Sequence, residues 1–103
     1  MIVHPASVVI TAYVAAWADD DLDRQAWLAD CLARHDNSDW GDLDQDDQAT
    51  NHHALRRQEG RLFSRYAVPD SFADDTDEDA VWIITDDLDD PDTATTILWP
   101  SDY

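Results

Sequence analysis

The chain has 103 residues, 44% of them hydrophobic, which is typical of a single domain with its own apolar core. Its 24 acidic residues against 6 basic ones give a formal net charge of −18, which argues against direct nucleic-acid binding and favours a positively charged partner protein. The single cysteine, Cys31, excludes an internal disulfide, so we expect a cytoplasmic protein.

The first apolar run, residues 8–18, has some features of a targeting or membrane segment. It ends in Ala16, Trp17 and Ala18, which resembles a signal cleavage site. No Lys or Arg precedes the run, however, and it is shorter than the ~18 apolar residues of a membrane-spanning helix. We therefore expect neither export nor contact with a membrane.

A short strand is predicted at residues 8–10, and Thr11 is suited to cap a helical turn that continues to Ala18. A second helix should begin near Asp20 or Asp21, where aspartates complement the helix dipole. Its apolar positions recur at helical spacing and define one buried face. That face comprises Trp27 or Leu28, Cys31, Leu32 and His35.

Residues 36–41 have the composition of a turn. Asp42 or Asp44 can cap a third helix that runs to about Gln58, and Gly60 is the expected left-handed residue that ends it.

The remainder of the chain predicts three strands, residues 62–68, 80–85 and 95–99, because each is rich in β-branched or aromatic residues. Acidic loops separate them. The middle strand is apolar on both faces, which favours a central position in an antiparallel meander. We expect one α+β domain over residues 1–103, with an N-terminal short strand and two to three helices packed on a C-terminal three-stranded antiparallel β-meander.

The acidic residues are unusual in kind, because all but Glu59 and Glu78 are aspartates and the chain has no lysine. One explanation is mimicry of nucleic-acid phosphates by short, stiff carboxylates. The other is a host proteome adapted to high salt or biased toward Asp codons, in which case the charge is only solvated surface. Composition leaves both open.

Four acidic clusters lie at predicted helix starts or in loops. The clusters at residues 19–23 and 39–47 fit ordinary helix capping. The clusters in the last two loops lack such a role, and no Lys or Arg lies within residues 86–92. In an extended backbone, alternate aspartates of residues 75–79 would form a ladder spaced about 6–7 Å apart. The predicted partner-binding residues are Asp75, Asp77, Asp79, Asp86, Asp87, Asp89, Asp90 and Asp92.

Metal binding and catalysis find little support. An EF-hand that started at Asp75 would have Ala80 and Asp86 where Gly and Glu are needed. Cys31 and His35 could bind zinc together with His52 and His53, but their spacing matches no zinc pattern, and a buried Cys with a helix-terminal His is the ordinary interpretation. No serine lies in a nucleophile elbow, and a chain with two glycines has no phosphate loop. We expect neither cofactor nor enzyme activity.

The chain contains the motifs Asp-Trp-Gly at 39–41, Trp-Ile-Ile-Thr at 82–85 and Thr-Thr-Ile-Leu at 95–98. With these motifs, residues 34–103 resemble a family of small bacterial proteins labelled plasmid-related, which plasmids, integrative elements and phage-like islands carry. The resemblance implies a mobile-element setting, in which small acidic proteins commonly disarm host defence. It also implies structural roles for Trp40, Asn51, Trp82 and Ile84.

The chain departs from that family after Thr85. Relatives have a short Glu-Ala-Asp-Arg-Ser connection, whereas this chain has a longer segment that lacks the arginine and contains five aspartates in residues 86–92. We therefore expect an acidic anti-defence inhibitor, a DNA-mimic-like decoy that binds the nucleic-acid-binding surface of a CRISPR or restriction complex. The alternative is a non-enzymatic accessory protein of a mobile element whose acidity reflects a halophilic or Asp-rich host.

Overall fold

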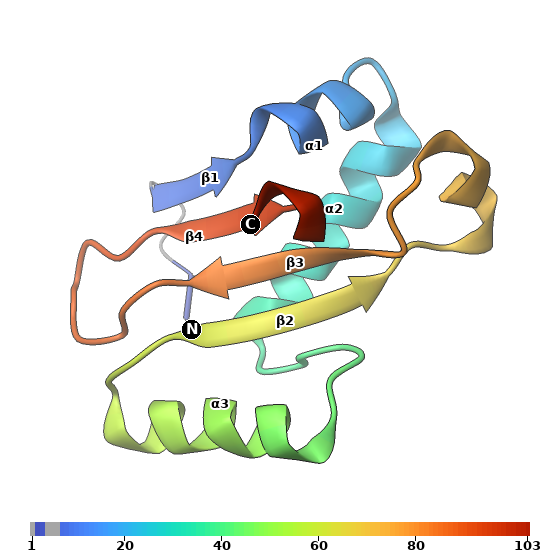
Figure 1. Ribbon diagram of the computed structural model, residues 1–103. Coiled ribbons are helices and arrows are strands. Elements are labelled where there is room, and N and C mark those ends of the chain that lie inside the picture. The colour runs from blue at the N-terminus through green and yellow to red at the C-terminus, as the bar shows by residue number, and fades with distance from the viewer. Residues whose placement is uncertain (1, 4–6) are drawn as a thin grey trace.

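The computed structural model describes residues 2–3 and 7–103 and has the α+β architecture expected from the sequence (Figure 1). Its elements, in chain order, are β1 (Val8–Ile10), α1 (Ala12–Ala18), α2 (Leu22–Asp36), α3 (Gln45–Arg57), β2 (Leu62–Ala67), the 3₁₀ helix η2 (Asp70–Asp75), β3 (Ala80–Thr85), β4 (Thr95–Leu98) and the 3₁₀ helix η3 (Pro100–Asp102). Within the described residues, no helix has the length and apolar character needed to cross a membrane.

The strands form one mixed sheet in the order β1-β4-β3-β2. The predicted antiparallel meander of β2, β3 and β4 is confirmed, and so is the interior position of β3. The short N-terminal strand extends this meander to four strands by pairing parallel to β4, with Val8 opposite Thr95 and Ile10 opposite Ile97. Residues separated by almost the whole chain thus meet at one edge.

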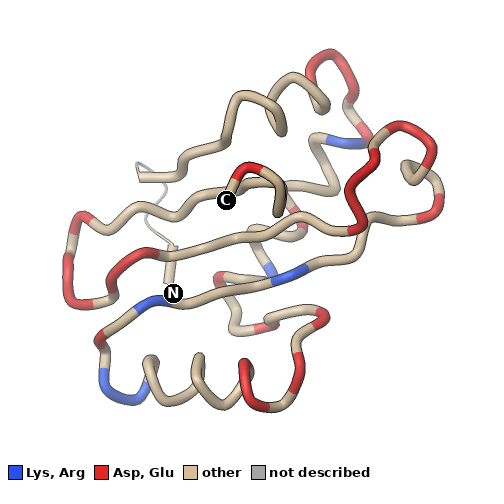
Figure 2. Tube along the Cα trace, in the orientation of Figure 1, with Lys and Arg blue, Asp and Glu red and all other residues tan. Residues whose placement is uncertain are grey.

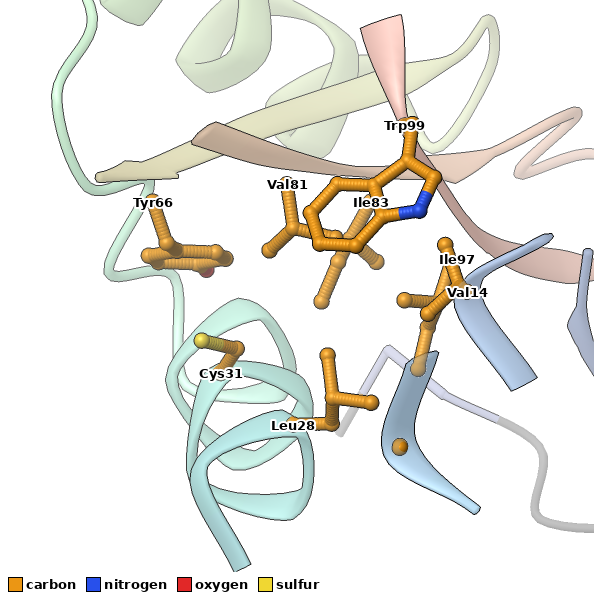
Figure 3. Close-up of a cluster of buried hydrophobic side chains, with 9 residues drawn as sticks. Val14, Leu28, Cys31, Tyr66, Val81, Ile83, Ile97 and Trp99 are labelled. Carbon is orange, nitrogen blue, oxygen red and sulfur yellow. The ribbon is translucent and has the colours of Figure 1, made fainter. Parts of the chain in front are cut away.

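Helices α1 and α2 pack on one face of the sheet, and the main core lies between these helices and the strands (Figure 3). The predicted buried face of the second helix is confirmed by Leu28, Cys31 and His35, whereas Trp27 and Leu32 are half-buried beside it. Burial of a side chain such as Leu28 contributes about 2 kcal/mol. The main core comprises Val14, Ala18, Leu28, Cys31, Tyr66, Val81, Ile83, Ile97 and Trp99.

Aspartates begin two of the helices, as expected. The Asp21 side chain accepts a hydrogen bond from the Arg24 amide at 3.1 Å, and Asp44 accepts one from the Asp47 amide at 2.8 Å. These bonds satisfy amides that a helix start leaves without partners. Thr11 does precede α1, but its hydroxyl donates to Asp102 at 2.7 Å rather than capping the helix.

The third helix ends at Arg57, close to the predicted Gln58, but the prediction of Gly60 as the left-handed residue that ends it is wrong. The left-handed residue that ends α3 is Gln58, with φ of 53°, and Gly60 lies further along the connection with φ of 87°. Gln58 tolerates this strained conformation because its amide and side chain both donate to the Leu55 carbonyl, at 3.2 and 2.6 Å.

The edge of the sheet at β2 is covered. The buried Asn51 side chain of α3 binds both backbone groups of Phe63, donating to the carbonyl at 2.7 Å and accepting from the amide at 3.1 Å. The Arg65 amide donates to the Trp40 carbonyl, and the Arg65 carbonyl accepts from the Asp42 amide. The implied structural roles of Trp40 and Asn51 are consistent with this arrangement.

Candidate acidic interface

The acidic residues lie mainly in loops and first helical turns, and these segments gather at the two ends of the sheet (Figure 2). We call residues 86–92, which connect β3 to β4, the acidic loop. We call the group formed by residues 19–23, 39–47 and 70–79 the broad acidic end. The strands between the two ends carry no acidic residue.

The acidic loop folds into two consecutive turns. The Asp87 carboxylate accepts a hydrogen bond from the Asp89 amide at 3.0 Å, and the Asp90 carboxylate accepts one from the Asp92 amide at 2.8 Å. The expectation that these aspartates lack a local structural role is therefore wrong for Asp87 and Asp90, which make the hydrogen bonds typical of Asx turns. Asp86, Asp89 and Asp92 are exposed and make no side-chain hydrogen bond with the described residues.

Contacts with the body of the protein hold the acidic loop in position. The Leu88 amide donates to the Gly60 carbonyl at 2.8 Å, and the Leu88 side chain packs against the small core of Trp40, Ala54 and Leu62. The Asp87 amide also donates to the Thr93 hydroxyl at 2.8 Å. These hydrogen bonds and the packing of Leu88 therefore hold the backbone that carries the carboxylates of the acidic loop.

The charge of the acidic loop is not neutralised within the described part of the chain. The ion pairs of the described arginines all go to acids elsewhere, namely Asp21, Asp39, Asp42, Glu59 and Asp75. The pKa of Asp89 is raised by desolvation of its carboxyl and then by the charges of Asp87 and Glu59. The contributions of Asp87 and Glu59 have the direction expected when neighbouring carboxylates repel one another.

At the broad acidic end, the predicted aspartate ladder does not form. Asp75 is the last residue of η2, and the backbone bends at Asp77 and Asp79 instead of running extended. Aromatic packing accounts for this, because Phe72 of η2 makes edge contacts with Trp17 and Trp27, with ring centroids 5.7 and 6.2 Å apart. These contacts draw the segment towards α1 and α2 and wind it into a 3₁₀ helix.

Arg24 joins two acidic segments that are far apart in the sequence. Its guanidinium lies 2.7 Å from the Asp75 carboxylate and 3.2 Å from that of Asp21. The structure therefore groups Asp75 with residues 19–23, which the sequence assigned to helix capping alone. Asp21 does cap α2, but Asp19 and Asp20 are exposed and make no ion pair with the described residues. Nothing in the local sequence indicated the pairing of Arg24 with Asp75.

The predicted binding residues therefore belong to two surfaces. Asp75, Asp77 and Asp79 precede β3, and the acidic loop follows it. The six residues of β3 separate these groups by roughly 20 Å. A partner that contacts both groups must have an elongated binding surface.

The serine, histidine and threonine side chains that resemble catalytic groups lie in the interior. His35 is hydrogen-bonded through Nδ1 to Ser64 Oγ at 2.5 Å and through Nε2 to Thr85 Oγ1 at 2.9 Å. All three side chains are fully buried, and burial, opposed by the nearby charge of Asp36, lowers the pKa of His35 to about 4. Burial also raises the pKa of Cys31 to about 12. Both ring nitrogens of His35 thus serve the fold.

Within residues 2–3 and 7–103, no three His, Cys, Asp or Glu side chains converge in an arrangement suited to a metal ion. Comparison of the chain with protein-family models, with curated proteins and with solved structures gives no match.

Proposed function

We propose that the protein is an acidic decoy of nucleic acid, an inhibitor that occupies the DNA- or RNA-binding surface of a CRISPR or restriction complex. The observation that carries the proposal is the acidic loop, where a hydrogen-bonded backbone presents five carboxylates without an arginine partner. Like charges held this close together destabilise the free protein. A cationic partner surface would relieve that repulsion.

The overall charge and size are consistent with this role. The longest dimension of the molecule is 40 Å, and duplex DNA of that length carries roughly 24 phosphate charges at one per ~1.7 Å. The chain has 24 acidic residues and a net charge of −18, so its charge per unit length approaches that of DNA. Opposite charge on the partner would give fast association that salt weakens.

The two acidic ends specify the shape of the partner surface. They lie at opposite ends of strands that are tied into one sheet, so their separation is fixed by the fold. A basic groove that holds a nucleic-acid duplex is long enough to contact both ends, whereas a small basic pocket reaches one only. The resemblance to a plasmid-related family adds the expectation that the partner belongs to host defence.

The test is competition with DNA. Purified restriction and CRISPR complexes of the host are mixed with labelled duplex, and the protein is added at low and at high salt. The proposal expects displacement of the duplex at about 0.1 M NaCl and little displacement at about 1 M, where charges are screened within ~3 Å. If no defence complex of the host loses DNA at low salt, the decoy role is excluded.

A second candidate is a non-enzymatic accessory protein of a mobile element whose acidity reflects its host. The observation that favours it is the distribution of the acids over both ends of the molecule and over α2 and α3, rather than on a single face (Figure 2). The Asp and Lys content of unrelated proteins from the same genome distinguishes the candidates. If the proteome is equally rich in Asp and poor in Lys, the charge of this chain no longer supports the decoy function, and the accessory protein is favoured.

A further inference from the structure

The two edges of the sheet differ in whether the outward-facing backbone groups of the edge strand have hydrogen-bond partners. At β2, the Asn51 side chain and the turn at Trp40 and Asp42 occupy backbone groups of Phe63 and Arg65. At the other edge, β1 pairs with β4 on one side and has no neighbouring strand on the other among the described residues. An uncovered edge strand is a template for pairing with another chain.

The β1 edge is also apolar. Val9 and Ile10 are 48% and 45% exposed, and Tyr13 of α1 is 74% exposed. Beside them, a groove of about 360 Å³ opens between β1, α1 and α2, with Ile10, Leu28 and Leu32 among its walls. The groove exists because α2 covers the inner face of the sheet at β2, β3 and β4 but does not extend under β1 (Figure 1).

This edge is built from a segment of the chain without charged side chains. Residues 1–18 contain no Asp, Glu, Lys or Arg, and the trace from β1 through α1 is tan in Figure 2. Asp19 is the one charged residue among the ten described residues that line the groove. Two molecules that each carry −18 repel strongly through most of their surfaces, and this surface is where they can approach with the fewest like charges in contact.

We propose that the β1 edge and its groove form the interface of a homodimer, in which β1 of one copy pairs antiparallel with β1 of a second copy around a twofold axis. A second copy fits because it brings the same uncharged surface and the same open edge, so the interface is self-complementary. A cationic partner finds no carboxylate on β1 or α1 to bind. The dimer joins the two sheets into one and leaves both acidic loops outside the interface, while Asp19 of the broad acidic end lines the groove. It does not depend on the proposed decoy function.

The salt dependence of the dimer is opposite to that of the decoy interaction. Apolar contacts and strand pairing hold the dimer, while the net charges of the two copies oppose it, so screening strengthens association. Capture of a basic partner is weakened by the same salt. The two proposals can therefore fail separately.

The test is sedimentation equilibrium of the purified chain between about 5 and 500 µM, a range suited to a small interface. At about 0.1 and 1 M NaCl, we expect a monomer–dimer equilibrium whose dissociation constant falls several-fold at the higher salt. Val9→Asp, which adds a like charge at the strand edge, should raise the dissociation constant at least about tenfold. Ala67→Asp adds the same charge at an exposed residue of β2 and should dimerise like the parent.

Ile10→Thr provides a second interface variant that keeps a β-branched residue in the strand and removes apolar surface from the groove, and it should also weaken the dimer. Circular dichroism confirms that each variant is folded. A chain that stays monomeric across the whole range at both salt concentrations overturns the proposal. Dimerisation of folded Val9→Asp and Ile10→Thr as strong as that of the parent also overturns it, because the interface then lies elsewhere.

Discussion

The Arg24 guanidinium lies 2.7 Å from the Asp75 carboxylate and ties the β2–β3 connection to the start of α2. The same side chain donates to the Trp17 carbonyl at 2.7 Å and stacks on the Trp17 ring, 4.8 Å from its centroid. Only 19% of the Arg24 side chain is exposed. One cation thus links α1, α2 and η2.

Replacement of Arg24 by Gln should destabilise the protein by about 1–3 kcal/mol, because the hydrogen bond to Trp17 is lost and Asp75 and Asp21 lose their shared cation. Urea unfolding measures the change. Arg57→Gln is the matched control, because its pair with Glu59 is more than half exposed at the arginine and should contribute less than about 1 kcal/mol. Equal losses in the two variants would contradict a special role for Arg24.

The buried His35 makes stability depend on pH. Its pKa is lowered from 6.5 to about 4, so the folded protein holds the imidazole neutral while the unfolded chain takes up a proton below pH 6.5. The neutral His35 therefore contributes its full stabilisation to the free energy of unfolding above pH 6.5. This contribution declines as the pH falls towards 4. Between pH 7.5 and 5 the decline amounts to about 2 kcal/mol.

His35→Gln isolates this effect from those of the other titratable groups. Urea unfolding of the parent and the variant at both pH values gives the difference. The parent should lose about 2 kcal/mol more than the variant on acidification. A parallel pH dependence in both proteins would show that His35 is not the responsible group.

The two glycines should respond differently to an added methyl group, although both have positive φ. In Gly41→Ala, the new Cβ would lie 2.1 Å from the Arg65 carbonyl oxygen, so the turn must separate from β2, at a cost of about 3 kcal/mol or more. In Gly60→Ala, the nearest atom is 3.9 Å away, and the left-handed conformation alone costs about 1 kcal/mol. Thermal unfolding ranks the variants, and the reverse order would refute the packing argument.

Substitutions in the acidic loop should weaken binding without weakening the fold. Asp86→Asn, Asp89→Asn and Asp92→Asn together remove three charges from residues without turn bonds, so the fold should be retained or slightly stabilised as repulsion falls. Affinity for the captured complex should fall, chiefly through slower association. Asp30→Asn removes one charge from an exposed helix residue outside both acidic ends, and it should reduce affinity by less than one third of the effect of the triple variant. An equal effect per charge would mean that total charge, and not the acidic loop, drives binding.

Local patterns in the sequence were sufficient to predict most elements of the fold. The caps at Asp21 and Asp44 and the buried face with Leu28 and Cys31 follow from neighbours within a few residues, and the structure confirms them. The pairing of β1 with β4 was missed, because a strand of three residues carries no pattern that specifies a partner about 87 positions away in the chain.

The sequence predicted which residues make the candidate site acidic, but not how the fold arranges them. The acidic clusters are visible in the sequence. The hydrogen bonds that the Asp87 and Asp90 carboxylates accept depend on the backbone path, however, and neither the residue type nor the spacing shows whether an aspartate makes such a bond. The ladder at residues 75–79 fails for a tertiary reason. Phe72 packs on two tryptophans contributed by α1 and α2, and no local pattern reports that contact.

The closure of the β2 edge by Asn51 also limits how large an assembly can grow. Filaments built by strand pairing need two open edges per molecule, so that each copy can accept one neighbour and offer itself to the next. Here the Asn51 amide occupies the backbone of Phe63, and β1 is the open edge among the described strands. Growth by edge pairing would therefore end with two chains, and an exposed apolar strand would not lead to fibres by this route.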